Sequence, residues 1–346
     1  VDRTWETIET YNAGIDFATL NNRLSGTFDY FIKDNKNMFY AEEFPTILGT
    51  SAPSINGAHV RTNGWELTLN WKDKIGKVGY RIGLNLSDNK TKVISLSDSR
   101  NPGHGLMGFV EGYPTNSFFI YEFDGFIKDE ADLADYKTKM KGGVPTNLRV
   151  GDAKYVDKDG DGVLEPTLYK EGDPNSGDIV YKGTNNQRYL YGINLGLDWK
   201  GIDISAFLQG VGKWDCINGT YAGGGEVWKQ SSQYFYHNTW SPDRPNAEYP
   251  RLTQDGGIHG YNYQWSDAPY KFFNNRYLRL KEVQIGYTFP TTLTKKIGVE
   301  KLRVYATGMN LLEWDNLPNG FDPEAPYTEN LIPFSRTYSI GVNVQF

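Results

Sequence analysis

The sequence predicts an all-β fold, a transmembrane antiparallel β-barrel, from three observations. First, segments of roughly ten residues alternate apolar and polar side chains, which is the length and pattern of a tilted strand that crosses a bilayer. Second, the polar positions are mostly Gly, Asn, Asp and Gln, which suit a water-filled lumen better than a packed core. Third, short and long connections alternate along the 346 residues.

Nine strands of this kind follow one another along the chain. Their apolar and polar faces lie within residues 11–17, 24–32, 65–71, 78–86, 189–199, 202–208, 283–289, 302–306 and 338–346. Aromatic residues stand at both ends of several apolar faces, as Trp65 and Trp71 do, and Tyr189 and Trp199. Such placement is typical of the aromatic girdles at the two membrane interfaces.

The connections predict the direction of the chain. Short ones lie at 18–23, 72–77, 200–201 and 290–301, and long ones at 34–59, 89–188, 212–276 and 311–335. Because outer-membrane barrels have short periplasmic turns and long extracellular loops, the first strand should begin outside and the last should end in the periplasm at Phe346. Since single-chain bacterial barrels have even strand numbers, nine strands predict that N-terminal strands are missing.

Composition excludes other classes of protein. Glycine (38) and proline (16) are frequent, and 15% of residues are aromatic, which favours strands and long turns. A net charge of −6 argues against nucleic acid as a partner. The single cysteine, Cys216, excludes an internal disulfide framework. No apolar stretch reaches the ~18 to 20 residues of a transmembrane helix.

Several short motifs run in order along nearly the whole chain, at residues 5–7, 11–17, 22–26, 240–252, 277–283, 286–290, 302–305, 308–311 and 320–324. These motifs resemble those of the SusC/RagA family of TonB-dependent outer-membrane transporters. The resemblance implies that residues 1–346 are the C-terminal part of a barrel, about nine of 22 strands. The plug domain and the box that contacts TonB would be absent from this chain, and residues 90–187 and 212–275 would be long extracellular loops.

The same resemblance implies a function and a place in the cell. Such a protein would lie in the bacterial outer membrane and import oligosaccharides, with peptides as the lesser option, using energy from TonB. A SusD-like surface lipoprotein would cover the external loops, and two barrels would assemble with two such lids. Outer-membrane lipids would surround the barrel, and no enzymatic activity is expected.

An acidic turn predicts a calcium site in the first long loop. Carboxylates at positions 1, 3 and 5, followed by glycine, are the first half of a calcium loop, but Leu168 stands where such loops have a bidentate Glu. A later carboxylate could replace it, either Asp173 or Asp178, and the family resemblance favours Asp178. The candidate ligands are Asp157, Asp159, Asp161, the carbonyl of Val163, and Asp178. The alternative is a plain acidic, glycine-rich turn.

Aromatic residues in the second long loop predict contacts with substrate. Trp214, Trp228, Trp240 and Trp265 lie within residues 212–275, and aromatic faces stack on sugar rings and on peptide side chains. Packing of the loop on its neighbours is the alternative for each of them.

Two other functions stay open on the sequence. A secreted soluble carbohydrate-binding or glycan-degrading β protein would share the aromatic content and the calcium motif, but it would not need alternating short and long connections. A passive porin of about ten strands conflicts with the odd strand number. The sequence contains neither a Gly-x-Ser-x-Gly elbow nor a zinc-protease motif.

Overall fold

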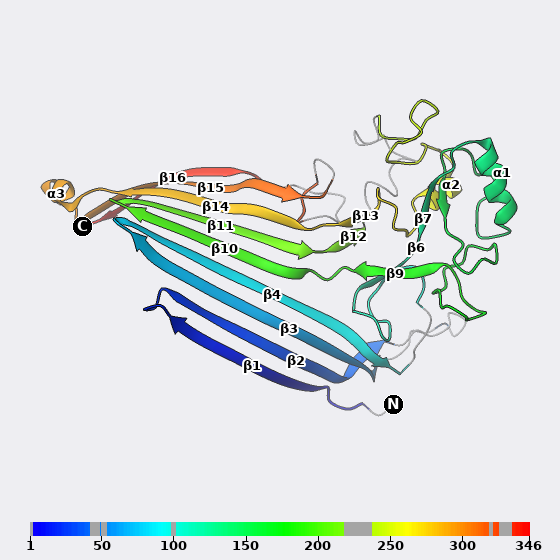
Figure 1. Cartoon of the computed structure of the whole chain (residues 1–346), viewed down its shortest axis with the longest axis horizontal. Helices are drawn as coiled ribbons and strands as arrows, with labels where there is room; N and C mark the ends of the chain where they lie inside the picture. Colours follow the sequence, from blue (N-terminus) through cyan, green and yellow to red (C-terminus); the bar gives the residue numbers. More distant parts are fainter. Residues whose placement is uncertain are drawn as a thin grey trace.

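The computed structural model describes residues 3–41, 49, 54–97, 102–217, 237–317, 321–324 and 334–346. Its main element is one nine-stranded antiparallel sheet, in which each strand pairs with the next one along the chain (Figure 1). The strands are β1 (Thr7–Thr19), β2 (Leu24–Ala41), β3 (Ser54–Ile75), β4 (Val78–Leu96), β10 (Arg188–Trp199), β11 (Ile202–Lys213), β14 (Tyr277–Thr288), β15 (Lys301–Asp315) and β16 (Thr337–Gln345). The nine expected strands and their antiparallel order are therefore confirmed.

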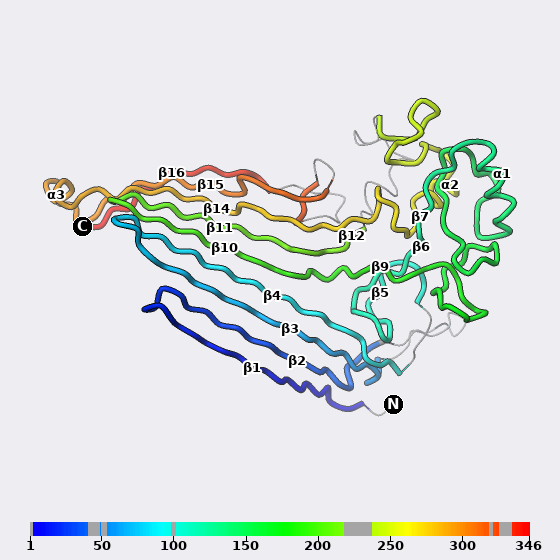
Figure 2. Tube along the Cα trace, viewed as in Figure 1, coloured from blue at the N-terminus to red at the C-terminus, as the bar shows by residue number. Residues whose placement is uncertain are grey.

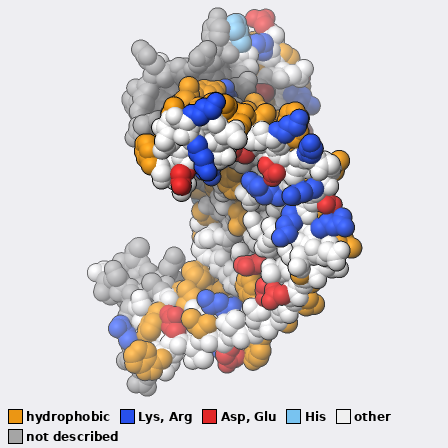
Figure 3. All heavy atoms as spheres, turned by 90° about the vertical axis from the view of Figure 1, so that its left-hand side faces the viewer, with side chains coloured by type: hydrophobic (Ala, Val, Ile, Leu, Met, Phe, Trp, Pro, Cys, Tyr) orange, Lys and Arg blue, Asp and Glu red, His pale blue; other side chains and the backbone are white. Residues whose placement is uncertain are grey.

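The sheet is strongly curved and encloses a trough. Seen along the strands from the end where the chain terminates, the molecule has the outline of a C, with the hollow on one side (Figure 3). Curvature of this kind is what a sheet needs to form part of the wall of a barrel.

Pairing between the strands aligns apolar residues into continuous rows. One row crosses six strands through Tyr80, Leu197, Ile204, Ile285, Ala306 and Ile340. Ile285 remains 52% exposed and Ile340 83% exposed, although both are large apolar side chains. An exposed apolar band of this extent marks a surface that contacts something other than water.

The opposite face of the same sheet is polar. Its rows pair Asp16 with Thr27, Thr27 with Thr68, Thr68 with Asn85, and Asn85 with Gly192. Side chains alternate between the two faces of a strand. This register therefore places the apolar row from Tyr80 to Ile340 on one face of the sheet and these polar residues on the other.

Three strands are much longer than the roughly ten residues expected from the sequence. β2, β3 and β4 have 18, 22 and 19 residues and continue past the end of β10. Charged pairs hold the extension together: the Asp34 carboxylate accepts hydrogen bonds from Arg61 Nε at 2.9 Å and from Arg61 Nη2 at 3.0 Å. Apolar alternation fades there, which is why the pattern did not reveal these residues as strand.

The connections at one end of the sheet are tight. Gly201, in the turn between β10 and β11, has φ +88°, and a Cβ at that position would lie 2.7 Å from the carbonyl oxygen of Thr288. Only glycine fits such a backbone without strain. The longest connection at this end contains α3 (Thr291–Thr294) and the 3-10 helix η3 (Lys295–Ile297).

At the other end, two long connections fold together (Figure 2). The first contains β5 (Gly105–Met107), β6 (Ser117–Tyr121), β7 (Phe123–Phe126), α1 (Glu130–Lys139), β8 (Ala153–Tyr155) and β9 (Ile179–Thr184). The second contains β12 (Asp215–Ile217), α2 (Gly256–Asn262) and β13 (Phe272–Asn274). We call residues 102–184 and 237–275 the loop domain.

The loop domain has its own hydrophobic core. Phe119, Ile127, Ala153 and Ile179 are 0% exposed, and they belong to one cluster with Ile258 and Tyr261 of the second connection. These long connections are therefore folded structure, whereas the sequence indicated only loops. Among the described helices, none is long and apolar enough to span a membrane.

Candidate functional site

The polar face of the sheet forms a groove inside the trough. Its volume is about 490 Å³, and its lining includes Arg23, Asn70, Arg81, Asn194 and Glu282. Cationic, amide and carboxylate side chains all reach this surface. Such a lining suits a wet or protein-filled interior, as the alternation predicts.

A buried arginine organises the loop end of the polar face. Arg279 on β14 is 1% exposed, and its guanidinium donates to Asp322 at 2.8 Å, to Glu324 at 2.8 Å and to Glu313 at 2.9 Å. Lys281, two residues along the strand, donates to Glu324 at 2.7 Å. These bonds fasten residues 321–324 against β14. The sequence predicts no role for Arg279, because nothing in an alternating strand marks which polar residue will be buried.

Hydrogen bonds join the two connections that make up the loop domain. The Nδ2 of Asn262, on α2, donates to Asp152 at 3.0 Å, and its Oδ1 accepts from the backbone N–H of Ala153 at 2.9 Å. The hydroxyls of Tyr136 and Tyr261 lie 2.9 Å apart. Because Asn262 is fully buried, both of its polar atoms need these partners.

The acidic turn lies on the first connection, directly after β8. Both oxygens of Asp157 accept backbone N–H groups of the turn, those of Gly160 and Gly162, each at 2.8 Å. Gly160 and Gly162 have φ +81° and +87°, conformations that glycine adopts without cost. The local sequence thus bends the chain around the carboxylate of Asp157.

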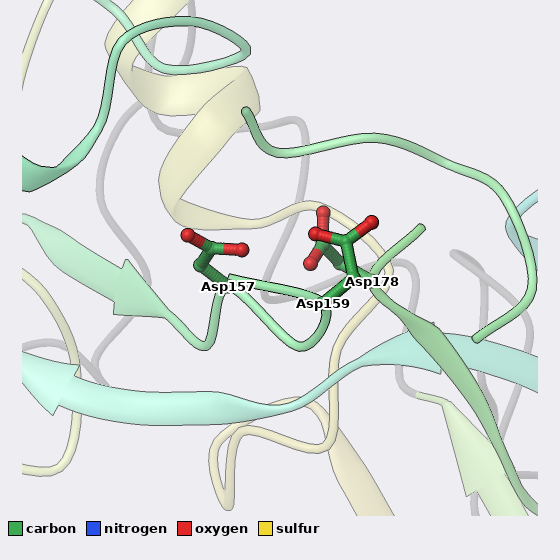
Figure 4. A group of neighbouring side chains, drawn as sticks. All are labelled: Asp157, Asp159 and Asp178. Atoms are coloured by element: carbon green, nitrogen blue, oxygen red, sulfur yellow. The ribbon is translucent and has the colours of Figure 1, made fainter. Parts of the chain in front are cut away.

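The structure brings together some of the predicted calcium ligands. Carboxylate oxygens of Asp157, Asp159 and Asp178 lie within 4.8 Å of one another (Figure 4). Asp178 immediately precedes β9 and is 0% exposed. Burial raises the pKa of the Asp178 carboxyl above its ordinary value, and the carboxylates of Asp159 and Asp157 raise it further.

The other predicted ligands are placed differently. The Asp161 carboxylate is exposed and accepts the backbone N–H of Val163 at 2.6 Å. Asp173, the alternative last ligand, accepts the backbone N–H of Asn175 at 3.0 Å and is not in the group. Asp161, Val163 and Asp173 therefore lie outside the carboxylate cluster that the structure brings together.

The candidate tryptophans are in separate places, and no ring contact joins any two of those described. Trp214 is 8% exposed, and its Nε1 donates to Asn185 at 2.8 Å. The ring of Trp240 covers Gly151, where a Cβ would collide with it. Trp265 packs against the cluster of Phe118, Ile120 and Ile217. Trp228 lies outside the described residues, so its role stays a prediction.

Comparison with known proteins gives three kinds of result. No family model matches the chain. TonB-dependent receptor P3 of Formosa agariphila is 27% identical over 99% of this chain and 34% of its own length. TonB-dependent receptor SusC of Bacteroides thetaiotaomicron is 24% identical over 99% of the chain and 32% of its own length. The chain thus spans about a third of the length of these relatives.

A solved structure shows the same fold. The structure described as the RagAB peptide transporter matches 100% of this chain and 36% of that chain, with a TM-score of 0.76 and 23% sequence identity. These comparisons confirm the resemblance to SusC/RagA-family TonB-dependent receptors, the fold class of a C-terminal barrel portion, and the location in the bacterial outer membrane. The relatives are named as receptors and transporters, which agrees with a function other than catalysis.

Proposed function

We propose that this chain forms the C-terminal part of the barrel of an energised outer-membrane importer. The observation that supports this most is the two-faced sheet, with continuous rows of exposed apolar residues on one side and a charged groove on the other. Lipid would contact the apolar side and the transport path would run along the polar side. Similarity to TonB-dependent receptors over 99% of this chain supports the energised form of transport over passive diffusion.

The substrate, the lid and the assembly are also part of the proposal. The cargo is an oligosaccharide, with a peptide as the second candidate because one similar structure is described as a peptide transporter. A SusD-like lipoprotein would cover the loop domain from outside, and two such pairs would associate. TonB would act through regions that correspond to the part of the relatives outside the third matched by this chain.

Transport can be tested in the native bacterium. We expect that deleting the gene abolishes uptake of fluorescently labelled neutral hexasaccharides or of labelled peptides, and that the full-length gene restores it. Deleting TonB should have the same effect as deleting the transporter, because the import would need energy. Uptake that persists without TonB would contradict the energised importer, and uptake unchanged by the gene deletion would contradict any transport role.

We further propose that Asp157, Asp159 and Asp178 hold a Ca²⁺ ion that orders the acidic turn. Three carboxylates so close together repel one another, and a hard divalent cation with oxygen ligands removes that repulsion. Asp161 and the carbonyl of Val163 would join only if the turn adjusts around the ion. Calcium is available to a loop that faces the outside medium.

The calcium proposal is tested on the full-length protein in detergent. At about a hundredfold excess over its dissociation constant, Ca²⁺ should stabilise the loop domain by about 2.7 kcal/mol, measured as slower hydrogen exchange of residues 155–180 than in EDTA. The double variant Asp157→Asn/Asp159→Asn should lose this protection. Asp173→Asn is the matched control and should keep it. Equal exchange with Ca²⁺ and with EDTA in the unmodified protein would refute the site.

A further inference from the structure

A second cavity lies between the loop domain and the rim of the sheet. Its volume is about 700 Å³, within the usual range of small-molecule sites. The loop domain contributes Phe123 and Phe126 of β7, residues 238 and 246–249, and Phe273 of β13. Asn316 and Leu317, just after β15, come from the rim of the sheet. A solute that passes from the outside into the trough would therefore meet this cavity at the rim.

Aromatic rings form the wall of this rim cavity. Phe126 and Tyr270 are stacked, with ring centroids 5.8 Å apart and 23° between their planes. Tyr270 is 4% exposed, and its hydroxyl donates to the carbonyl oxygen of Asn262 at 2.6 Å, so this ring is held in place. Phe126 is only partly buried. Its ring is thus supported from behind by a fixed tyrosine while part of it remains accessible.

Polar side chains surround the aromatic wall. Asn246, Glu248 and Asn316 are exposed, and within the described part of the chain their side chains form no hydrogen bond. They can therefore donate to and accept from a solute without breaking internal bonds. The described lining contains no lysine, arginine or histidine, so the Glu248 carboxylate has no cation beside it in the rim cavity.

We propose that the rim cavity binds a neutral pyranose unit of an oligosaccharide; this rests on the proposed import function. The face of a pyranose carries C–H groups that pack on an aromatic ring, and its hydroxyls pair with amide and carboxylate groups. A uronic acid, a sulfated sugar or the carboxylate end of a peptide would bring negative charge to Glu248, and the described lining holds no lysine, arginine or histidine to compensate it. The geometry and charge together favour neutral sugar over acidic sugar and over peptide.

The test measures binding to the purified full-length protein in detergent, apart from transport. Isothermal titration would use maltohexaose, cellohexaose, laminarihexaose, hexagalacturonate and a neutral pentapeptide. We expect at least one neutral hexasaccharide to bind and hexagalacturonate not to bind. Phe126→Ala should weaken that sugar about tenfold, the effect of losing ring stacking and ring burial. Asn246→Ala/Glu248→Ala, which changes only exposed side chains, should weaken it by a similar factor.

A matched control separates this site from general damage to the loop domain. Phe109 is also in the loop domain and is 37% exposed, but it does not line the rim cavity, so Phe109→Ala should leave the affinity unchanged. Stronger binding of hexagalacturonate or of the peptide, failure of every neutral sugar to bind, or unchanged affinity in both cavity variants would each overturn the proposal. The import function would still stand if TonB-dependent uptake of labelled cargo persisted in those cases.

Discussion

Lys271 illustrates how much a single buried side chain in the loop domain depends on tertiary contacts. It is 7% exposed, and within the described residues its ammonium group has no carboxylate partner. Its Nζ lies 5.8 Å from the centre of the Trp265 ring. Burial lowers the pKa of Lys271 from 10.5 to about 8, because the charged form loses water without gaining an ion pair.

The pKa of Lys271 predicts a pH dependence of stability. Between about pH 8 and pH 10.5, Lys271 has lost its proton in the folded protein but still binds it in the unfolded chain. The free energy of unfolding therefore rises with pH across that window. Below about pH 8, the buried charge of Lys271 lowers the free energy of unfolding by up to about 3 kcal/mol. Lys271→Met should therefore be more stable than the unmodified full-length protein at pH 7, measured by thermal unfolding in detergent.

The difference in stability between Lys271→Met and the unmodified protein should shrink as the pH approaches 10.5. Comparing the two proteins at the same pH cancels the effects of other titrating groups. Trp265→Leu at both pH values is the control for the lost ring contact. A stability difference that stays constant with pH would show that Lys271 is not desolvated in the folded protein.

Among the binding candidates, local sequence and tertiary structure contributed differently. Asp157 and Asp159 stand out because a calcium-loop motif is written in adjacent residues. Asp178 is 21 and 19 positions further on, respectively, and only the family resemblance singled it out before the structure placed it beside them. Arg279 lies in the motif at 277–283, but nothing in the sequence predicts that it is buried or that Phe126 lines a cavity, since burial and cavity walls are set by neighbours from distant segments.

At the scale of elements, the alternation of side chains predicted the strands and their faces. Leu195 and Asn194 are neighbours on β10 but lie on opposite faces. Leu195 is 41% exposed and pairs with Ile82 and Ala206 in an apolar row, whereas Asn194 lies in the polar row of Gly83 and Asn70. They make a matched pair for testing which face contacts lipid.

We expect Leu195→Lys to destabilise the full-length protein in lipid vesicles by about 2 to 4 kcal/mol, because the charge would enter the hydrocarbon region. Asn194→Lys should change the stability by no more than about 0.5 kcal/mol, since its side chain points into a wet groove. Urea unfolding in vesicles, followed by tryptophan fluorescence, measures both. Equal losses, or a greater loss for Asn194→Lys, would mean that the faces have been assigned the wrong way round.

The limits of alternation appear at the loop ends of the strands. The extensions of β2, β3 and β4 carry charged pairs such as Asp34 with Arg61, and they alternate poorly. Pairing with a neighbouring strand, and not local pattern, makes these residues extended. Strand number was therefore predictable from sequence, while strand length depended on contacts between residues 27 positions apart.

At the scale of the whole molecule, the two long connections form one domain at the end of the sheet. Residues 237–275 supply α2, whose Tyr261 and Asn262 bond to residues of the first connection. The rim cavity exists only because this domain meets the end of β15. If the chain works as the proposed importer, substrate would be met first by this composite structure and then by the polar groove.

The sequence by itself determined the all-β class, the nine strands, their two chemical faces and the family resemblance, because alternation and short motifs are local properties of the chain. Only the tertiary structure decided the fold of the long connections, the burial of Arg279 and Lys271, the cluster of Asp157, Asp159 and Asp178, and the rim cavity. Each of these brings together segments far apart in sequence, and their contacts depend on how the curved sheet positions its ends.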